Sequence, residues 1–451
     1  MVNSPYFRSS SRYLLALVCL ISTTGLACQT QGGGGPLTIP GLEQLQPKAQ
    51  VLTQRVKKPI PGNPQSLNLS NAEQLDQFAQ NLTYSGTSVS ELAALLSPQA
   101  RTDAEKARLA YSWITQHIGY DVTLNRDDLS PEGVLQRRKT ICGGYANLYQ
   151  ALAKEMGLQA VIIEGYAKGV GGIVGDDSQL NHAWNAVDIE GAWYLIDTTW
   201  GAGNVNNQEF QAQFSPFYFA TPPTRLINTH FPAETQWQLF QPLMTRTEFD
   251  QLPVLSPRFY RDRLTLAQPN QGKLQANGNL ALSLGVPDDI QVVARLQTDQ
   301  GQELATNQTL VQRIGNQATV QVAFPNPGNY QLLILSKNSQ ETIYAQAIAV
   351  EIQALAAGQP FPKTYGTFSD KQVYLQMPLA TSLPANQAAQ FQLRVPQAQK
   401  VLVIDSQSKK WVELGRSGDV FSGPVFIGNN PVVVVAQFPG SEKFWSLLEY
   451  N

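Results

Sequence analysis

The chain has 451 residues, of which 43% are hydrophobic and 15% are charged, and its formal net charge is −2. This apolar content is enough for packed cores and excludes wholesale disorder. The balanced charge, with no strongly basic stretch, argues against a nucleic-acid-binding protein. Three cysteines and three histidines leave no CxxC or HExxH arrangement, so a structural zinc site is excluded. The length predicts roughly two to four domains.

The first residues of the chain have the pattern of an export signal. Arg8 and Arg12 precede an apolar run that is too short to cross a bilayer and fits the core of a signal peptide over residues 1–27. The residues before Cys28 resemble a bacterial lipobox, in which this cysteine carries the lipid, although Gly25 stands where such boxes usually have leucine. We therefore expect a lipid-anchored protein of the bacterial envelope. Simple cleavage with secretion, or a retained anchor, are the alternatives.

A tether and a helical region follow the expected signal. Residues 28–66 contain a glycine run and frequent prolines, which disfavour regular structure. Three capping-box patterns, each a hydroxyl residue three positions before a glutamate, then predict helix starts at Ser70, Ser88 and Thr102. The last of them opens a helix with apolar residues at helical spacing, which ends near His117.

The next segment mixes a helix with a buried strand. A helix is expected over 145–156, where apolar residues form one stripe and Gly157 is suited to end it. A strand over 160–163 and a glycine-rich loop over 169–181 come next. This loop is expected to be mobile and to lie over a cleft.

Beyond residue 255 the chain carries short β-rich runs with turn signals and no helical pattern. Their spacing fits two β-sandwich domains of about a hundred residues each, over 256–356 and 357–451. A mixed region of helices and strands over 67–255 precedes them. The expected class is therefore α+β, followed by two all-β domains.

Cys142 is the one thiol left in the body of the chain once the export signal and Cys28 are set aside. It comes just before a predicted helix, whose unpaired amides and dipole stabilise a thiolate. Gly143 and Gly144 remove side-chain bulk and let a substrate approach the backbone closely. The Cys142 amide is a candidate donor to a developing oxyanion. A buried, inert cysteine is the alternative.

His182 and Asp197 are placed by the geometry of a predicted hairpin. Strands are expected over 182–189 and 192–200, joined by the two residues between them. In this register the two side chains share one face as diagonal neighbours, roughly 7–8 Å apart at the backbone. Asp197 can then hold the imidazole tautomer while the other ring nitrogen faces the thiol. Taken alone, each has a structural alternative, as a packed histidine and a turn-capping aspartate.

Three motifs in this order resemble the transglutaminase-like superfamily, over 141–146, 181–185 and 191–200. Segments over 218–222, 229–232 and 237–239 are similar to the region that follows this core in kyphoscoliosis-peptidase-type members, and the β-rich C-terminal half suits that group. The resemblance implies a papain/transglutaminase-like α+β core, with helices and an antiparallel sheet. It also implies that the two sandwich domains are immunoglobulin-like.

The resemblance also implies a role for each residue of a catalytic triad. Cys142 would be the nucleophile, His182 the general base and acid, and Asp197 the residue that orients the histidine. The implied reaction is acyl transfer through a thioester, which water or a second amine resolves. His230 falls in the segment after the core and is expected to have a packing role.

The second oxyanion donor and the reaction itself stay open at this stage. The further substrate or oxyanion candidates are Gly143, Gly144, Trp184, Trp113 and Tyr120. The peptidase-type branch favours hydrolysis of protein or peptide amides in the cell envelope over transglutaminase-type cross-linking. A non-catalytic envelope binding or scaffold protein is a further alternative. No metal, cofactor or nucleic acid is expected.

Overall fold

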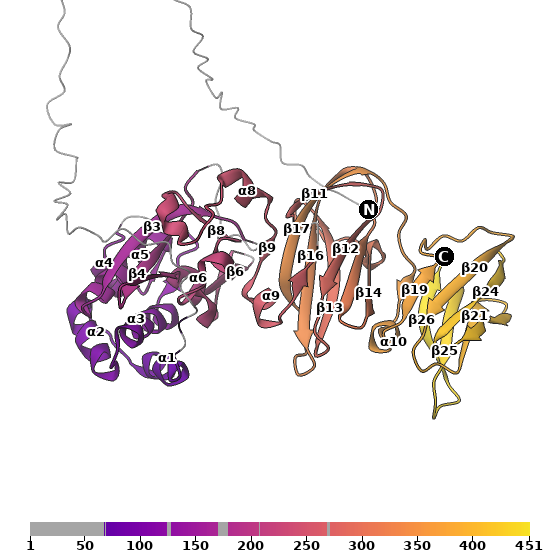
Figure 1. The fold of residues 1–451 in the computed structure, drawn as a ribbon, viewed down its shortest axis with the longest axis horizontal. Helices are drawn as coiled ribbons and strands as arrows, with labels where there is room; N and C mark the ends of the chain where they lie inside the picture. The colour runs from indigo at the N-terminus through magenta and orange to yellow at the C-terminus, as the bar shows by residue number, and fades with distance from the viewer. Residues whose placement is uncertain (1–66, 68, 124–127, 170–178, 207, 268–270) are drawn as a thin grey trace, which may run out of the picture. The chain divides into compact units, whose positions relative to one another are not determined.

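The computed structural model describes residues 67–451 with the exception of 124–127, 170–178 and a few single positions or short runs at 68, 207 and 268–270 (Figure 1). The described part forms a mixed region of helices and sheet and then two all-β units. Most of the glycine-rich loop, the expected signal and tether, and Cys28 lie outside the described residues. Within the described part, no helix is long and apolar enough to cross a membrane.

The mixed region begins with a group of helices. The capping box at Thr102 is confirmed, because its hydroxyl accepts from the Glu105 amide at 3.2 Å and the Glu105 carboxylate accepts from the Thr102 amide. At α2 only half of the predicted box is present: the Ser88 hydroxyl accepts from the Glu91 amide, but the Ser88 amide donates to the Tyr84 hydroxyl and not to Glu91. The prediction for Ser70 is wrong, because the first helix begins one residue later, after Asn71. These helices are α1 (Ala72–Asn81), α2 (Val89–Leu96), α3 (Asp103–His117), α4 (Pro131–Arg137) and α5 (Cys142–Glu155).

Helix α5 starts earlier than expected, at the candidate thiol itself. Ile141 is its N-cap in extended conformation, so Cys142 is the first helical residue. The C-terminus is as predicted, since Gly157 adopts a φ of +85°. The Leu158 amide then bonds back to the Ala153 carbonyl at 2.9 Å, which satisfies a carbonyl of the last turn.

An antiparallel sheet with strand order β5-β4-β3-β8 packs against α5 (Figure 1). The predicted hairpin register is confirmed, because Asn185 pairs with Ile196 and Ile189 pairs with Ala192. The two turn residues, Glu190 and Gly191, have φ values of 55° and 87°, as a tight hairpin turn requires. The strands are β3 (Gln159–Ala167), β4 (His182–Ile189), β5 (Ala192–Ile196) and β8 (His230–Pro232).

The second strand of the hairpin is shorter than predicted. It ends at Ile196, because Asp197 leaves the sheet and becomes the N-cap of a short helix, α6 (Thr198–Ala202). The expected strand over 192–200 is therefore wrong in its last residues. The remaining short elements of the mixed region are β1 (Gly119–Tyr120), β2 (Lys139–Thr140), β6 (Gly203–Asn206), β7 (Glu209–Ala212), α7 (Pro223–Leu226), α8 (Arg246–Gln251), η2 (Ser97–Gln99), η3 (Pro216–Tyr218) and η4 (Thr235–Gln238).

The first all-β unit consists of two sheets around an apolar core. Their strand orders are β10-β12-β15-β14 and β11-β17-β16-β13, and β9 also pairs with β17. Strand β9 thus joins this unit two residues before the expected boundary at 256. The elements are β9 (Val254–Leu255), α9 (Pro257–Arg261), β10 (Thr265–Leu266), β11 (Lys273–Asn277), β12 (Leu280–Gly285), β13 (Ile290–Thr298), η5 (Thr306–Gln308), β14 (Thr309–Ile314), β15 (Gln317–Val322), β16 (Gly328–Asn338) and β17 (Ala345–Ala356).

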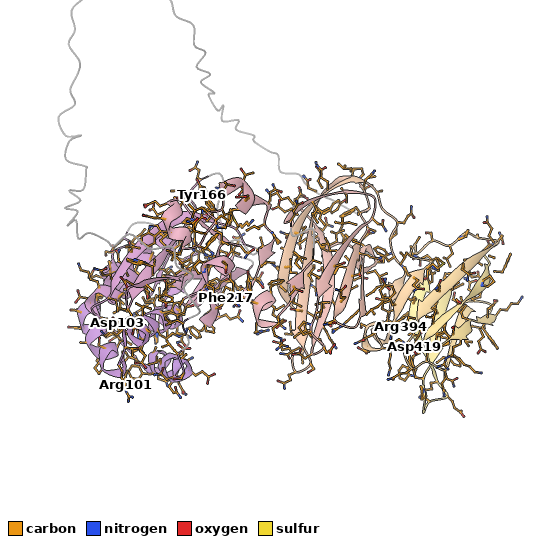
Figure 2. All side chains as sticks on the ribbon, viewed as in Figure 1. Arg101, Asp103, Tyr166, Phe217, Arg394 and Asp419 are labelled. Atoms are coloured by element: carbon orange, nitrogen blue, oxygen red, sulfur yellow. The ribbon has the colours of Figure 1, made fainter. Side chains whose placement is uncertain are left out.

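The second all-β unit repeats the two-sheet plan. Its strand orders are β18-β26-β25-β21-β22 and β19-β20-β24-β23. Arg394 and Asp419, which lie side by side in Figure 2, form an ion pair at 3.5 Å on its surface. The elements are β18 (Lys363–Thr364), α10 (Gly366–Asp370), β19 (Tyr374–Met377), β20 (Gln387–Arg394), β21 (Lys400–Asp405), β22 (Trp411–Glu413), β23 (Gly415–Ser417), β24 (Val420–Ile427), β25 (Val432–Gln437) and β26 (Phe444–Tyr450).

Candidate active site

Asp197 lies at the centre of a buried polar cluster. Its Oδ1 accepts hydrogen bonds from the backbone amides of Thr199 at 2.8 Å and Trp200 at 3.0 Å, which makes it the N-cap of α6. Its Oδ2 accepts from His182 at 2.8 Å and from His230 at 2.9 Å. An aspartate at an N-cap is favourable because it satisfies otherwise unpaired amides. The same four bonds also fix the direction of the carboxylate.

His182 connects this carboxylate to the thiol. It is the first residue of β4 and is fully enclosed. Its Nε2 donates to Asp197, so Nδ1 is the nitrogen left for the hydrogen bond with Cys142. The three residues of the predicted triad are therefore brought together in one hydrogen-bonded chain, Cys142–His182–Asp197.

The half-buried Cys142 thiol is set up to be a thiolate. Burial raises the pKa of the thiol. The hydrogen bond and positive charge of His182 and a hydrogen bond from the Ala183 amide lower this pKa by more, so the net pKa is below its ordinary value. A position in the first turn of α5 favours the anion as well. Asn185 holds this helix against β4 by donating to the Ala146 carbonyl at 3.1 Å.

His182 and Asp197 each stabilise the ionised form of the other. Burial lowers the pKa of His182, but the carboxylate of Asp197 and the bonds to both partners raise it, to about 10. Burial raises the pKa of Asp197, and the two histidines hold it well below its usual range. These pKa shifts favour the ion pair of a thiolate and an imidazolium over the neutral thiol and imidazole.

His230 is a site residue whose role the sequence did not show. It opens β8, which pairs with β3 on the edge of the sheet away from the hairpin. Its Nε2 lies 2.9 Å from Oδ2 of Asp197, and its Nδ1 lies 2.8 Å from the Thr229 hydroxyl. The expected packing role is thus incomplete. The available signal was a histidine in the segment just after the core, but only the pairing of β8 brings it to Asp197.

Two tryptophans enclose the histidine pair. Trp184 is 2% exposed and stacks on His182 with ring centroids 5.9 Å apart. Trp200 lies against His230 with centroids 4.5 Å apart and is only partly buried. The predicted substrate or oxyanion role of Trp184 stays a prediction, since its buried indole N–H has no hydrogen-bond partner among the described residues.

The two glycines after the thiol differ in how much space a side chain would have. A Cβ on Gly144 would lie 1.9 Å from the Thr140 hydroxyl, so this glycine makes room for a neighbouring strand and not for a substrate. A Cβ on Gly143 would meet only a methyl of Leu129, at 3.3 Å. Gly144 is therefore required by packing, whereas close substrate approach stays a prediction for Gly143, which is half-buried beside Cys142.

Of the two upstream oxyanion candidates, Trp113 is used in the helical core, whereas Tyr120 lies near the thiol. Trp113 is completely buried, donates its indole N–H to the Leu82 carbonyl and stacks on His117. Its predicted oxyanion role is wrong, because its donor is already used in the helical core. Tyr120 lies on β1, whose register places it beside Thr140, two residues before the thiol. It stays a candidate.

The described residues contain one group of side chains close enough to hold a metal ion. It consists of His182, Asp197 and His230, whose ligand atoms lie within 4.8 Å of one another. These atoms already bond one another as donors and an acceptor, with Asp197 saturated by four hydrogen bonds. Their arrangement therefore fits a proton-holding network around a thiol.

A thiol at the start of a helix, packed on an antiparallel sheet that supplies a histidine and a capping aspartate, defines the papain/transglutaminase-like class. Residues 90–198 match the family model of the transglutaminase-like superfamily. Residues 246–363 match the model of the KY-like, immunoglobulin-like domain. The chain thus carries a transglutaminase-like domain followed by a KY-like immunoglobulin-like domain, which confirms the resemblance and the fold class. The family supports a site of the cysteine acyl-transfer type.

The similar proteins include two kyphoscoliosis peptidases. The one from Homo sapiens is 34% identical over 228 residues, which are 49% of this chain and 34% of that protein. The one from Mus musculus is 31% identical over 291 residues, 62% of this chain and 43% of that protein. The chain therefore spans less than half the length of these relatives. A solved structure, described as that of a TGase, is 20% identical over 30% of this chain and 34% of that chain, with a TM-score of 0.19.

Proposed function

We propose that this protein is a cysteine acyl-transfer enzyme that hydrolyses protein or peptide amides through a thioester on Cys142. The observation that carries the proposal is the continuous hydrogen-bonded chain from the half-buried thiol through His182 to Asp197. Such a chain is the general requirement for an activated thiol nucleophile: a lowered thiol pKa, an adjacent base, and a third group that orients the base.

In the first half of the reaction, the thiolate attacks the amide carbonyl and forms a carbon–sulfur bond. His182 then gives its Nδ1 proton to the departing amine as the carbon–nitrogen bond breaks. This leaves a thioester and a neutral imidazole. The backbone amide of Cys142 lies in the first turn of α5, where it has no acceptor within the helix and can donate to the developing oxyanion.

In the second half, neutral His182 removes a proton from water, and the resulting hydroxide attacks the thioester. The carbon–sulfur bond breaks, the carboxylic acid leaves, and the thiolate–imidazolium pair is restored. An amine in place of water would give transamidation. The relatives named kyphoscoliosis peptidase support hydrolysis as the reaction here.

The test is the rate of Cys142 alkylation by iodoacetamide as a function of pH. An ion-paired thiolate should react well below the free-thiol pKa of about 8.5. His182→Ala should move the profile toward that of a free thiol. His117→Ala is the matched control, because His117 bonds the Trp113 carbonyl inside the helical region, and it should leave the profile unchanged. A thiol indifferent to His182 would indicate a non-catalytic binding or scaffold protein.

The reaction is assigned with a peptide substrate, with and without an added primary amine. Release of a new amino terminus without amine incorporation would support hydrolysis. Incorporation of the amine into the peptide would instead establish transglutaminase-type cross-linking. Cys142→Ser should abolish either reaction if the thioester is on the path.

We also propose that the protein is exported and held at the bacterial envelope by a lipid on Cys28, where it meets its protein or peptide substrates. The support is the signal-like sequence over 1–27 and the lipobox-like residues before Cys28. Expression in bacteria with labelled palmitate should give a labelled, membrane-associated protein. Cys28→Ala should lose the label while Cys19→Ala keeps it. Release of an unlabelled parent protein into the medium would favour simple secretion.

A further inference from the structure

A second histidine bonds the triad carboxylate, although a triad requires only one. His230 and His182 both place Nε2 within hydrogen-bond distance of the same oxygen, Oδ2 of Asp197. The side chains of all three residues are 0–2% exposed, so water does not compete for these bonds. Each bond to this carboxylate is therefore made in a dry, low-dielectric environment, where charge-assisted hydrogen bonds are strongest.

The protonation state of His230 follows from its partners. A carboxylate can only accept, so Nε2 of His230 carries a hydrogen. Burial lowers the pKa of His230 more than Asp197 raises it, so the ring is neutral and Nδ1 is an acceptor. The Thr229 hydroxyl, at 2.8 Å from Nδ1, supplies the matching donor in preference to its longer contact with the Leu226 carbonyl at 3.2 Å. Thr229 thereby holds the tautomer that donates to Asp197.

We propose that His230 is a positioning residue for the acyl-transfer reaction. As a neutral donor fixed by Thr229, it holds the orientation of Asp197. Its hydrogen bond to Oδ2 also weakens the attraction between the carboxylate and the His182 imidazolium. The inference rests on the proposed function, since it concerns the same triad. Its consequence is a His182 imidazolium that is stable at rest and still able to release its proton to the leaving amine.

Few other groups near Asp197 can change charge over the working pH range. Tyr218 packs against His230 with centroids 6.3 Å apart, and burial raises the pKa of Tyr111, Tyr145 and Tyr218 well above the usual value, so these phenols stay neutral. The groups that titrate around the carboxylate are therefore Cys142 from α5, His182 from β4 and His230 from β8. A change in the pH profile on substitution of His230 can be read through these three groups.

The test compares His230→Gln with His230→Phe. Glutamine keeps an N–H donor where Nε2 stands but loses the ring, whereas phenylalanine keeps the ring that packs on Trp200 and Trp184 but loses the donor. If His230 positions Asp197, Gln should retain most of the activity and Phe should lose about tenfold or more in kcat with little change in KM. The alkaline limb should move to higher pH in Phe alone. If His230 only packs, Phe should be the more active variant, and this reversed order would overturn the inference.

A second measurement uses the fact that the chain has only three histidines. Nitrogen-15 labelling of histidine should give one neutral ring protonated at Nε2, which is His230, and one doubly protonated ring, which is His182. Thr229→Val should perturb the His230 signal selectively. A doubly protonated His230 would contradict the proposal. If the parent lacks the His182-dependent thiolate reactivity, the proposed function itself fails, whereas a reactive parent with the reversed variant order refutes only the role of His230.

Discussion

At the scale of single residues, the two carboxylate oxygens of Asp197 bind different partners. Oδ1 caps α6 through two backbone amides, and Oδ2 accepts from two histidines. The cap fixes the carboxylate on the backbone, so the direction of Oδ2 does not depend on the histidines alone. A helix cap and an orienting partner of His182 are thus not alternatives at this position, because the same carboxylate bonds both the α6 amides and the histidine.

This double role predicts the effect of Asp197→Asn. The amide can still cap α6 through its oxygen, but it no longer carries the charge that stabilises the His182 imidazolium. We expect kcat to fall by about 10⁴-fold and the alkaline limb to move from near pH 10 toward pH 6.5, the ordinary pKa of histidine. Asp188→Asn, an exposed cap in the hairpin turn, is the control and should change neither. An unshifted alkaline limb in Asp197→Asn would contradict the assignment.

The same charges make stability depend on pH. The folded-state pKa of His182 is raised from 6.5 to about 10, so its contribution is complete below pH 6.5 and is lost as the pH rises to about 10. The pKa of Asp197 is lowered from 3.8, so its contribution is present above that pH and is lost as the pH falls further. Urea unfolding of the parent and Asp197→Asn should therefore differ most between about pH 4 and 6.5. A difference in unfolding free energy that does not shrink toward pH 10 would refute this account.

At the scale of elements, the sequence was sufficient where local rules decide the outcome. The left-handed pair Glu190 and Gly191 sets the hairpin register, and that register places His182 near Asp197. The end of the second strand was not predictable from apolar alternation, because the cap at Asp197 overrides it. His230 was missed for a different reason: it reaches Asp197 through the pairing of β8 with β3, a contact between distant segments.

Helix α5 offers a prediction from its two neighbouring glycines. Gly144→Ala places a Cβ 1.9 Å from the Thr140 hydroxyl, and this β-branched side chain has little freedom to move. We expect a loss of about 1–3 kcal/mol of unfolding free energy in chemical denaturation. Gly143→Ala meets only a flexible leucine methyl and should cost less, since alanine also gains up to about 1 kcal/mol in helix propensity. Equal losses for the two variants would contradict the packing argument.

The Gly144 prediction can be checked by a compensating change. Thr140→Ala removes the hydroxyl and the methyl that would clash, although its own Cβ still lies 2.9 Å from the added one. The double variant should therefore recover part of the stability lost in Gly144→Ala, and the two changes should not be additive. Additive losses would mean that the strain arises elsewhere in the helix.

At the scale of the whole molecule, the buried apolar residues fall into several clusters and not into one core. The mixed region has an aromatic cluster that includes Trp113, Tyr145 and Tyr149. The first sandwich is built around residues such as Phe324, and the second around residues such as Phe391. A chain of this length exceeds what a single core usually supports, so division into domains is expected.

Separate cores predict separate unfolding. Leu148 is completely buried in α5, and Leu148→Ala should cost the mixed region about 2–5 kcal/mol through the cavity it leaves. If the domains unfold independently, hydrogen exchange should speed up in peptides from α5 and β4 and stay unchanged in peptides from β20 and β25. Phe391→Ala is the reciprocal variant; its cluster also includes Leu310 and Ala323 of the first sandwich, so exchange should accelerate in the sandwiches and stay unchanged in α5 and β4. Acceleration throughout the chain from either variant would show one cooperative unit, and the transglutaminase-like domain would then depend on the sandwiches for its stability.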